Sequence, residues 1–432
     1  MTPEVRDRID QIRQGIVPEG YKKTESGIIP NEWRVEQVSK CIEEYKFFSN
    51  DISHIPVYSS SRKGLVPQSD YYNQREAVET NLGYKVVPQG YVTYRHMSDD
   101  DVFHFNINKT GENVLVSSEY PVFTSSDNCD LSFLISVLNN TARFRYFCKM
   151  QKLGGTRTRL YLDNLKRYAL ALPPFDEQKK IAEILSTQDK AIELQERKIE
   201  ELKRFKKGCL EKMFPRKGQK VPETRFPGFT DDWEQRKLGD IGETYTGLSG
   251  KTKADFGHGQ ARFVTYMNVF SNPISNPEMT EPIEIDPKQN EVEVGDVFFT
   301  TSSETPEEVG MSSVLLEKRG KTYLNSFCFG FRPSEIIDSY YLAYMLRSES
   351  ARDKIILLAQ GISRYNISKN KVMEIAVSLP SLDEQKLIGQ YFRQLDNLIT
   401  LHQRKLDEMK KQKKALMQLL LTGIVKTKGE VR

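Results

Sequence analysis

The sequence predicts an α+β fold: two mixed α/β domains in a pseudo-twofold, circularly permuted repeat, separated by two long antiparallel coiled-coil helices. The first supporting observation is an internal repeat, since residues 172–214 recur as residues 379–421 without a gap, at an offset of 379 − 172 = 207 positions. The second is heptad spacing in both copies. The third is that the segments preceding the two copies align loosely with each other, for example at Trp33 and Trp233.

Apolar residues in both copies are spaced alternately four and three positions apart, which is typical of a coiled-coil seam. A seam in each of two segments of one chain is most simply buried by the other seam. The alternative is that each helix lies on its own domain, but a globular helix is seldom so long. The predicted seam residues are Ile181, Leu185, Ile192, Ile199 and Leu202 in the first copy, and Ile388, Phe392, Leu395, Ile399, Leu406 and Met409 in the second.

Lys206 and Lys413 fall at the same seam position in the two copies. A lysine there weakens packing but helps to fix the register. We expect Asp176 and Asp383 to cap the N-termini of the two helices. Each helix should run for roughly 33 residues, or about 50 Å.

The two ends of the chain complete the repeat. Residues 1–33 are comparable with the segment that follows the first long helix and ends at Trp233. The N-terminal segment is therefore the continuation that the C-terminal helix lacks, as in a circular permutation. This places the termini close together and requires the long helices to be antiparallel.

These boundaries predict six segments. An N-terminal helix and connector (1–30) precede the first α/β domain (31–173), in which strands are expected at 84–87, 90–94 and 113–116 and a helix at 130–147. The first long helix (174–214), a linker rich in Pro, Gly and Lys (215–230), the second α/β domain (231–380) and the second long helix with its tail (381–432) follow.

Composition limits the class of protein. The 432 residues carry a net charge of only +4, and the five cysteines have no CxxC spacing. No secretory leader or long apolar span is visible, so we expect a cytoplasmic protein without membrane contact. Basic residues gather at 143–167 and 203–220, where either a nucleic-acid contact or an ordinary solvated helix face fits.

No catalytic motif stands out. Residues 245–252 end like a phosphate-binding loop, but that pattern requires glycine where Tyr245 stands. Leu172-Pro173-Pro174-Phe175 is similar to the tetrad of amino-methyltransferases but lacks its polar first residue, and the prolines fit a strand end better. The five histidines have no metal-ligand spacing. The residues therefore predict a chain without catalytic or metal sites.

The paired Leu-Pro-x-x-x-Glu-Gln motifs, the long-helix repeats and the permuted N-terminus resemble the specificity (S) subunit of type I restriction–modification enzymes over essentially the whole chain. The resemblance implies two target-recognition domains that each read one half of a split double-stranded DNA site, with the coiled coil as a ruler. It also implies docking of two modification (methyltransferase) subunits that use S-adenosylmethionine. Restriction (endonuclease and translocase) subunits would use ATP and Mg, and this chain would carry no catalysis.

A different class also fits: a non-catalytic coiled-coil scaffold that presents two protein-binding modules. The third hypothesis is an enzyme, a split methyltransferase.

Two loops combine glycine, hydroxyl groups and arginine, which suit phosphate and base-edge contacts. For Arg157 and Arg364 the alternative is a salt bridge to a neighbouring carboxylate. Residues 71–75 (Tyr71, Tyr72, Asn73, Gln74, Arg75) fit either base contact or an amphipathic turn. The predicted DNA-binding residues are Thr156, Arg157 and Arg159 in the first loop, Ser363, Arg364, Tyr365 and Asn366 in the second, Tyr94, Arg95, Ser302 and Ser303 after a shared strand, and Lys251.

Overall fold

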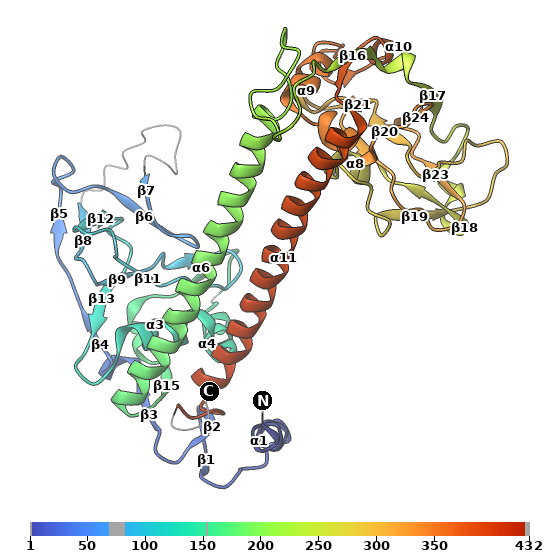
Figure 1. Ribbon diagram of the computed structural model, residues 1–432. Helices are drawn as coiled ribbons and strands as arrows, with labels where there is room; N and C mark the ends of the chain where they lie inside the picture. Colours follow the sequence, from blue (N-terminus) through green and yellow to red (C-terminus); the bar gives the residue numbers. More distant parts are fainter. Residues whose placement is uncertain (1, 69–82, 153, 428–432) are drawn as a thin grey trace. The chain divides into compact units, whose positions relative to one another are not determined.

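The structure, a computed structural model, describes residues 2–68, 83–152 and 154–427. The chain divides into two compact units: unit 1 is Met1–Leu194 with Leu406–Arg432, and unit 2 is Gln195–Lys405. Each unit contains one mixed α/β domain and one half of each long helix (Figure 1). The predicted contact segment 71–75 lies outside the described residues.

The two long helices are α6 (Phe175–Lys212) and α11 (Leu382–Leu421), of 38 and 40 residues. At 1.5 Å per residue, α6 is about 57 Å long, somewhat longer than the sequence predicts. Asp176 and Asp383 lie inside the first turns. They are therefore not the N-caps that we expected, although acidic side chains in a first turn still favour the helix dipole.

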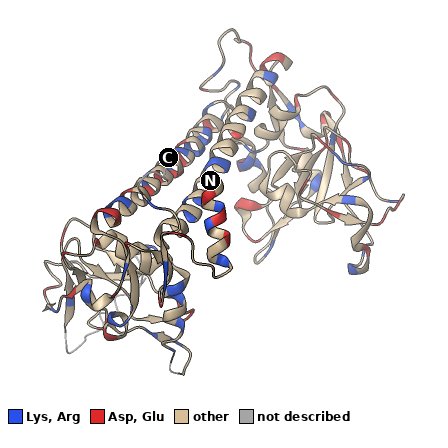
Figure 2. Cartoon of the chain, turned by 90° about the horizontal axis from the view of Figure 1, so that it is seen from below, with Lys and Arg blue, Asp and Glu red and all other residues tan. Residues whose placement is uncertain are grey.

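The predicted seam is the buried face of both helices. Every seam residue is buried or half-buried, while most residues between them are exposed. Acidic and basic residues occur along the whole length of both helices (Figure 2), most of them at exposed positions. In unit 1, Ile181 and Leu185 of α6 share a core with Leu420 of α11. In unit 2, Phe214, just after α6, stacks on Phe392 near the start of α11 with ring centroids 5.9 Å apart. Contacts nearer the middle of the helices, Asp189 with Lys413 in unit 1 and Gln195 with His402 in unit 2, show that the helices are antiparallel within each unit.

Polar contacts between the two helices repeat the same symmetry. Lys206 in unit 2 binds Asp396 at 2.6 Å, and Lys413 in unit 1 binds Asp189. These pairs are equivalent, because 206 + 207 = 413 and 189 + 207 = 396. Gln195 donates to His402 Nδ1 and to its carbonyl oxygen at 2.8 Å each, which places two equivalent positions opposite each other. The pseudo-twofold prediction is confirmed by these contacts.

The chain termini meet in unit 1, as the permutation requires. Tyr21 donates its hydroxyl to Gly423 O at 3.0 Å, and Arg8 donates to Ile424 O at 2.8 Å. Val5 and Trp33 share the core that also contains Leu420. In unit 2, Phe214 packs edge-on against Trp233 with ring centroids 6.4 Å apart. The N-terminal segment thus packs at the end of α11 in the same way as the segment that follows α6 packs at the end of α6.

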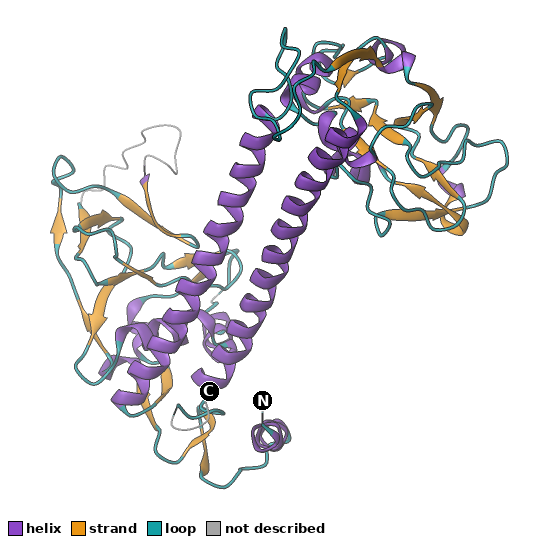
Figure 3. Ribbon diagram, in the orientation of Figure 1, coloured by secondary structure: helices purple, strands orange, loops and turns teal. Residues whose placement is uncertain are grey.

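The domain of unit 1 is built from short strands and short helices (Figure 3). A break at Thr141 divides the expected 130–147 helix in two, because Thr141 takes an extended backbone conformation. The elements of unit 1 are α1 (Pro3–Arg13), β1 (Tyr21–Thr24), β2 (Gly27–Pro30), β3 (Arg34–Gln37), η1 (Val38–Lys40), β4 (Ile42–Glu44), β5 (Phe48–Ser49), β6 (Tyr58–Ser61), β7 (Gly64–Pro67), β8 (Tyr84–Val87), β9 (Val92–Thr93), β10 (Met97–Ser98), β11 (Asn106–Ile107), β12 (Val114–Val116), β13 (Val122–Ser125), α3 (Leu131–Asn140), α4 (Ala142–Lys149), β14 (Thr158–Arg159), α5 (Leu162–Lys166) and β15 (Ala169–Leu172).

The domain of unit 2 has the same general make-up. Its elements are β16 (Glu234–Lys237), η2 (Leu238–Asp240), β17 (Gly242–Thr246), η3 (Lys253–Asp255), β18 (Phe256–Val264), α7 (Tyr266–Ser271), β19 (Thr280–Ile283), β20 (Val297–Thr300), β21 (Ser302–Ser303), η4 (Pro306–Glu308), β22 (Ser312–Val314), β23 (Thr322–Leu324), β24 (Cys328–Pro333), α8 (Ser339–Met345), α9 (Glu349–Ile356), β25 (Tyr365–Asn366), α10 (Lys369–Met373) and β26 (Ala376–Leu379).

The two domains share one strand order. The four-stranded sheet of unit 1 is β11-β9-β13-β4, and that of unit 2 is β22-β20-β24-β17, in which each strand is the counterpart of the one in the same place. In both, antiparallel pairs connect the first strand of the domain to the last, β3 with β15 and β16 with β26. Those last strands lead directly into the long helices, so each domain is fixed to its helix at both ends.

The glutamine of the repeated motif explains this attachment. Gln178 is buried, accepts from Asp130 N at 2.8 Å and donates to Pro173 O at 2.9 Å. Gln385 accepts from Asp338 N at 3.0 Å and donates to Pro380 O at 2.9 Å. Asp130 and Asp338 in turn cap α3 and α8. One side chain therefore joins the end of a strand, the start of a short helix and a long helix.

None of the helices in the described ranges is long and apolar enough to cross a membrane.

Candidate nucleic-acid interface

A short strand pair brings the predicted contact loops together in each unit. β10 pairs with β14 so that Ser98 faces Thr158, and β21 pairs with β25 so that Ser303 faces Tyr365. The Gly-Arg loop therefore lies beside the segment that follows the shared strand in both domains. The sequence predicted these loops separately and gave no signal that they are paired.

In unit 1 the loop residues Thr156, Arg157 and Arg159 are exposed, and so is Arg95. The prediction that Tyr94 contacts DNA is wrong. Its side chain is 0% exposed and donates its hydroxyl to Leu160 O at 3.0 Å, inside the core. Residues alternate between the two faces of a strand, so the side chain next to an exposed arginine points inward.

Three consecutive aspartates organise this surface, and we name Asp99, Asp100 and Asp101 the acidic turn. Asp99 accepts from Arg157 Nε at 2.8 Å, which is the salt bridge weighed as an alternative for that arginine. Asp100 accepts from Arg62 at 2.6 Å, and Asp101 accepts from the Thr158 hydroxyl. Sequence reasoning missed Arg62 and the acidic turn, although a run of three aspartates after the shared strand was a visible signal.

A cavity of about 490 Å³ opens beside the acidic turn. Its lining includes Arg62, Lys63, Arg95, Asp99 and His104. Burial, followed by the positive charge of Arg62, lowers the pKa of His104 from its ordinary value. The imidazole is therefore neutral at pH 7, and the charges lining the cavity come from the arginines, the lysine and the aspartate.

In unit 2 the equivalent loop is more open. Residues 361–364 are exposed between two backbone hydrogen bonds that join Gln360 and Asn366, at 2.9 and 2.8 Å. Gly361 has a φ of 142°, and a Cβ there would lie 2.0 Å from Arg364 O, so the turn requires glycine. Within the ranges that the structure covers, Arg364 forms no salt bridge. Glu304, the counterpart of Asp99, is exposed and does not pair with it.

Three other predicted residues of unit 2 are engaged within the protein. Ser302 and Ser303 are each 5% exposed, and Ser303 donates its hydroxyl to Thr305 O. Lys251 binds Asp286 at 2.7 Å with its side chain 13% exposed. The prediction that these side chains contact DNA is wrong for the two serines, which are buried, and finds no support for Lys251. Tyr365 is half-buried and Asn366 is exposed.

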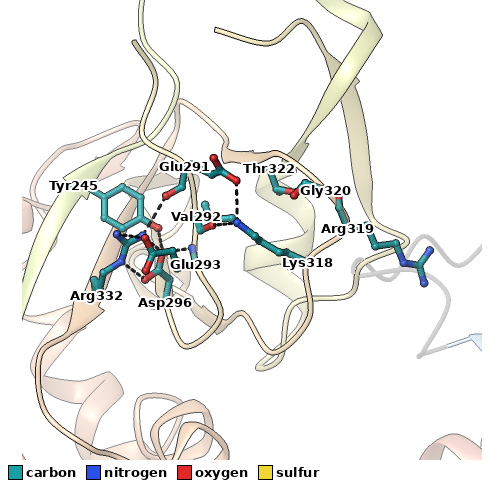
Figure 4. Close-up of polar contacts among 10 residues, drawn as sticks. All are labelled: Tyr245, Glu291, Val292, Glu293, Asp296, Lys318, Arg319, Gly320, Thr322 and Arg332. Atoms are coloured by element: carbon teal, nitrogen blue, oxygen red, sulfur yellow. Dashed lines mark hydrogen bonds and ion pairs between the residues drawn. The ribbon is translucent and has the colours of Figure 1, made fainter. Parts of the chain in front are cut away.

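An ionic cluster around the buried Asp296 lies at the four-stranded sheet of unit 2, where β17 carries Tyr245 and β24 carries Arg332 (Figure 4). Asp296 is 1% exposed and accepts from the Tyr245 hydroxyl at 2.5 Å, from two nitrogens of Arg332 at 2.8 Å each and from Glu293 N at 2.7 Å. Burial, followed by the negative charge of Asp296, raises the pKa of Tyr245. All acceptor positions of the carboxylate are used, so this cluster is structural.

The two basic runs differ. In the 203–220 run, carboxylates pair with Lys203, Lys206, Lys207, Lys212 and Lys220. A solvated, ion-paired face accounts for it. In the 143–167 run, Arg143 stacks over the Tyr168 ring and Lys166 binds Glu44.

A duplicated, permuted α/β domain joined by paired long helices defines a class of DNA specificity proteins, and comparison with known proteins identifies that class. The family model for the type I restriction modification DNA specificity domain matches residues 39–204 and 230–411. This chain belongs to that family and is a specificity subunit.

Two relatives from Methanocaldococcus jannaschii support this assignment. A protein assigned as the type I restriction enzyme MjaX specificity subunit is 24% identical over 438 residues, covering 95% of this chain and 97% of the relative. The MjaVIII specificity subunit is 27% identical over 286 residues, covering 62% and 64%. A chain from a solved structure of the type I R-M system has the same fold, with a TM-score of 0.58 at 14% identity, covering 92% of this chain and 99% of that one.

Proposed function

We propose that this subunit reads a bipartite double-stranded DNA site, with each α/β domain contacting one half. The long helices set the length of the unread spacer, and the chain docks two modification subunits. The observation that carries the proposal is the equivalent placement of two exposed arginine loops, 156–159 and 363–366, on a duplicated scaffold.

The difference between the loops supports reading of two unlike half-sites. Arginine and short polar side chains at a loop suit base edges and phosphates. In unit 1 the exposed set is Thr156, Arg157 and Arg159, and in unit 2 it is Ser363, Arg364 and Asn366. One scaffold with two different contact surfaces is what a split, asymmetric site requires.

Catalysis belongs to the partners in this proposal. S-adenosylmethionine binds to the modification subunits, and ATP and Mg bind to the restriction subunits. The complex works in the cytoplasm, where it meets chromosomal and incoming DNA.

The test is a domain exchange. Residues 31–172 are replaced by the corresponding segment of a relative with a different target, and the hybrid is assembled with its modification subunits. Sequencing of methylated adenines should show that one half-site changes while the other half-site and the spacer are kept. Unchanged specificity, or loss of both half-sites in a folded hybrid, would contradict the proposal.

The ruler role has its own test. One heptad inserted into α6 and a matching heptad in α11 lengthen each helix by about 10 Å, close to three base pairs of B-DNA. The spacer should lengthen accordingly with both half-sites unchanged. A mobility shift with and without the modification subunits separates this function from a protein-binding scaffold, which would not retard DNA in either case.

A further inference from the structure

A two-stranded ribbon in the domain of unit 1 ends in an exposed turn. β6 and β7 (Figure 1) pair only with each other in the described chain, and the tight turn between them consists of Arg62 and Lys63. The ribbon is fixed to the domain next to its turn. Asn106 donates to Ser60 Oγ at 2.7 Å and to Ser61 O at 2.9 Å. It is therefore a stiff element with two basic residues at its tip.

The tip arginine is held without being covered. Arg62 binds Asp100 through one terminal nitrogen at 2.6 Å, while its side chain stays 63% exposed. Asp100 is itself fixed, because it accepts from Ser98 Oγ at 2.9 Å and from Val102 N at 3.4 Å. Since one contact uses few of the five guanidinium donors, the remaining donors are available to a ligand.

A second arginine is held by the neighbouring carboxylate in the same way. Arg157 binds Asp99 at 2.8 Å and is 49% exposed. Arg62 and Arg157 come from segments 95 positions apart, and the acidic turn brings both to one face. Arg95 and Lys63 line the cavity on the same side.

We infer that the β6–β7 ribbon is the major-groove reader of unit 1, with Arg62 contacting a guanine of the half-site, Lys63 contacting a phosphate and Asp100 positioning Arg62. The inference rests on the proposed function and names the element and the residues that perform it in one domain.

Three physical arguments support it. The major groove admits a two-stranded ribbon, and arginine bound to guanine O6 and N7 is the commonest specific contact there. An arginine already held in place loses less side-chain entropy on binding. A carboxylate beside it repels phosphates, which directs the guanidinium to base edges, whereas Lys63 suits a phosphate as a point charge.

Unit 2 lacks an equivalent ribbon in its described residues. Its β18 and β19 belong to a three-stranded sheet with β23, and its two-stranded sheets, β16-β26 and β21-β25, join strands far apart in the chain rather than the two strands of a hairpin. The two domains therefore use different elements, and the ribbon is specific to the half-site of unit 1.

The test uses the full subunit assembled with its modification subunits, and a panel of duplexes in which each base pair of both half-sites is changed in turn. Arg62→Ala should reduce methylation of the cognate site about 10- to 100-fold and abolish discrimination at one G·C position. Arg62→Lys should also lose that discrimination, because lysine keeps the charge but not the fork. Lys63→Ala should weaken all sites alike and lower the slope of log affinity against log salt by about one.

Asp100→Asn should give a smaller loss of discrimination at the same position, as expected of a positioning residue. Arg6→Ala, at an exposed arginine of α1, is the control for loss of one positive charge. Discrimination at the half-site of unit 2 should be intact in every variant, which shows that the complex is folded.

Cognate methylation and discrimination within twofold of the wild type for Arg62→Ala would overturn the inference. If the exchange of residues 31–172 moves one half-site while Arg62→Ala is silent, only the ribbon assignment fails. If the exchange moves neither half-site, the proposed function fails.

Discussion

The two units have the same scaffold but stabilise equivalent positions by different chemistry. Next to β4 and β9 of unit 1, Tyr45 packs edge-on against Tyr91 with ring centroids 5.2 Å apart. At the corresponding positions of unit 2, Tyr245 binds the carboxylate of Asp296, which Arg332 neutralises. An apolar pair and an ionic cluster thus serve corresponding positions, so the backbone plan does not dictate how its interior is filled.

The contacts that are identical in both units lie where the domain meets the long helices. Gln178 and Gln385 make the same bridging hydrogen bonds, and the Lys–Asp pairs between helices are interchanged by the pseudo-twofold axis. A fold that must dock onto one common pair of helices keeps these contacts in duplicate. The outer strands and loops carry no such constraint and can diverge.

The glutamate of the repeated motif, at the start of each long helix, is held by different partners in the two units. Removing its partner in unit 2 should have the largest effect on stability. Glu177 accepts from Trp33 Nε1 at 3.0 Å, whereas Glu384, 0% exposed, accepts two hydrogen bonds from Arg225 at 2.7 and 2.8 Å. Arg225→Met should lower the free energy of unfolding of unit 2 by about 3–5 kcal/mol, because it leaves a buried charge unpaired.

Urea unfolding followed by hydrogen exchange, which resolves the two units, measures this effect. The matched change in unit 1 is Trp33→Phe, which removes one hydrogen bond to a half-buried carboxylate and part of a buried ring, and should cost about 2 kcal/mol. Equal losses in the two units would show that the carboxylates are held equivalently after all.

The duplicated glutamines should give similar losses. Gln178→Ala and Gln385→Ala each leave a part-buried backbone N–H and a buried proline carbonyl without their partner, at about 2–3 kcal/mol. Gln178 also donates to Asn128 O at 3.3 Å, so the loss in unit 1 should be the larger by a few tenths of a kcal/mol. Thermal unfolding of the two single variants tests the equivalence, and a loss confined to one of them would break it.

The scaffold could be predicted from the sequence because its signals are periodic or repeated. The seam from Ile181 to Leu202 follows from heptad spacing, and the meeting of Tyr21 with Gly423 follows from the permuted repeat. The capping role given to Asp176 was wrong by a few residues, because the helix begins at Phe175, directly after the two prolines. The position of a residue in a periodic pattern predicts whether it is buried, but it does not predict at which residue a helix begins.

The contact surface was harder to predict, since residue type does not reveal partners that are distant in the chain. Arg62 and Asp100 are 38 positions apart, and nothing local indicates that they meet. Tyr94 has the composition of a contact residue and lies in the core instead. The loop at Arg364 was visible because glycine, hydroxyl and arginine are adjacent in sequence.

The loops that carry Arg364 and Arg157 should contribute unequally to the methylation of their half-sites. Arg364 has no carboxylate partner in the described structure, whereas Arg157 is bound by Asp99. Arg364→Ala should reduce methylation about 10-fold on sites that carry the half-site of unit 2, or roughly 1.4 kcal/mol. Arg157→Ala should have a smaller effect on the half-site of unit 1, because Arg62 still contacts that half-site. Single-turnover methylation of duplexes altered in one half-site at a time measures both, and normal rates on all duplexes for Arg364→Ala would contradict its role.

The smallest expected difference is one of pH. Burial is the main cause that lowers the pKa of both His96 and His104 in unit 1, while His258 of unit 2 is exposed. Below an unfolded pKa of about 6.5 the unfolded chain binds more protons than the folded one, so stability that is present above that pH is lost as pH falls toward the folded pKa values. The carboxylate of Asp100, which acts on His104, does not reverse the trend, because the pKa of Asp100 is itself lowered and the group stays ionised at pH 5.5. Hydrogen exchange at pH 7.5 and 5.5, corrected for the intrinsic rate, should therefore show opening of unit 1 increasing more than that of unit 2. The double variant His96→Gln with His104→Gln should remove the difference, and an unchanged difference would assign it to other groups.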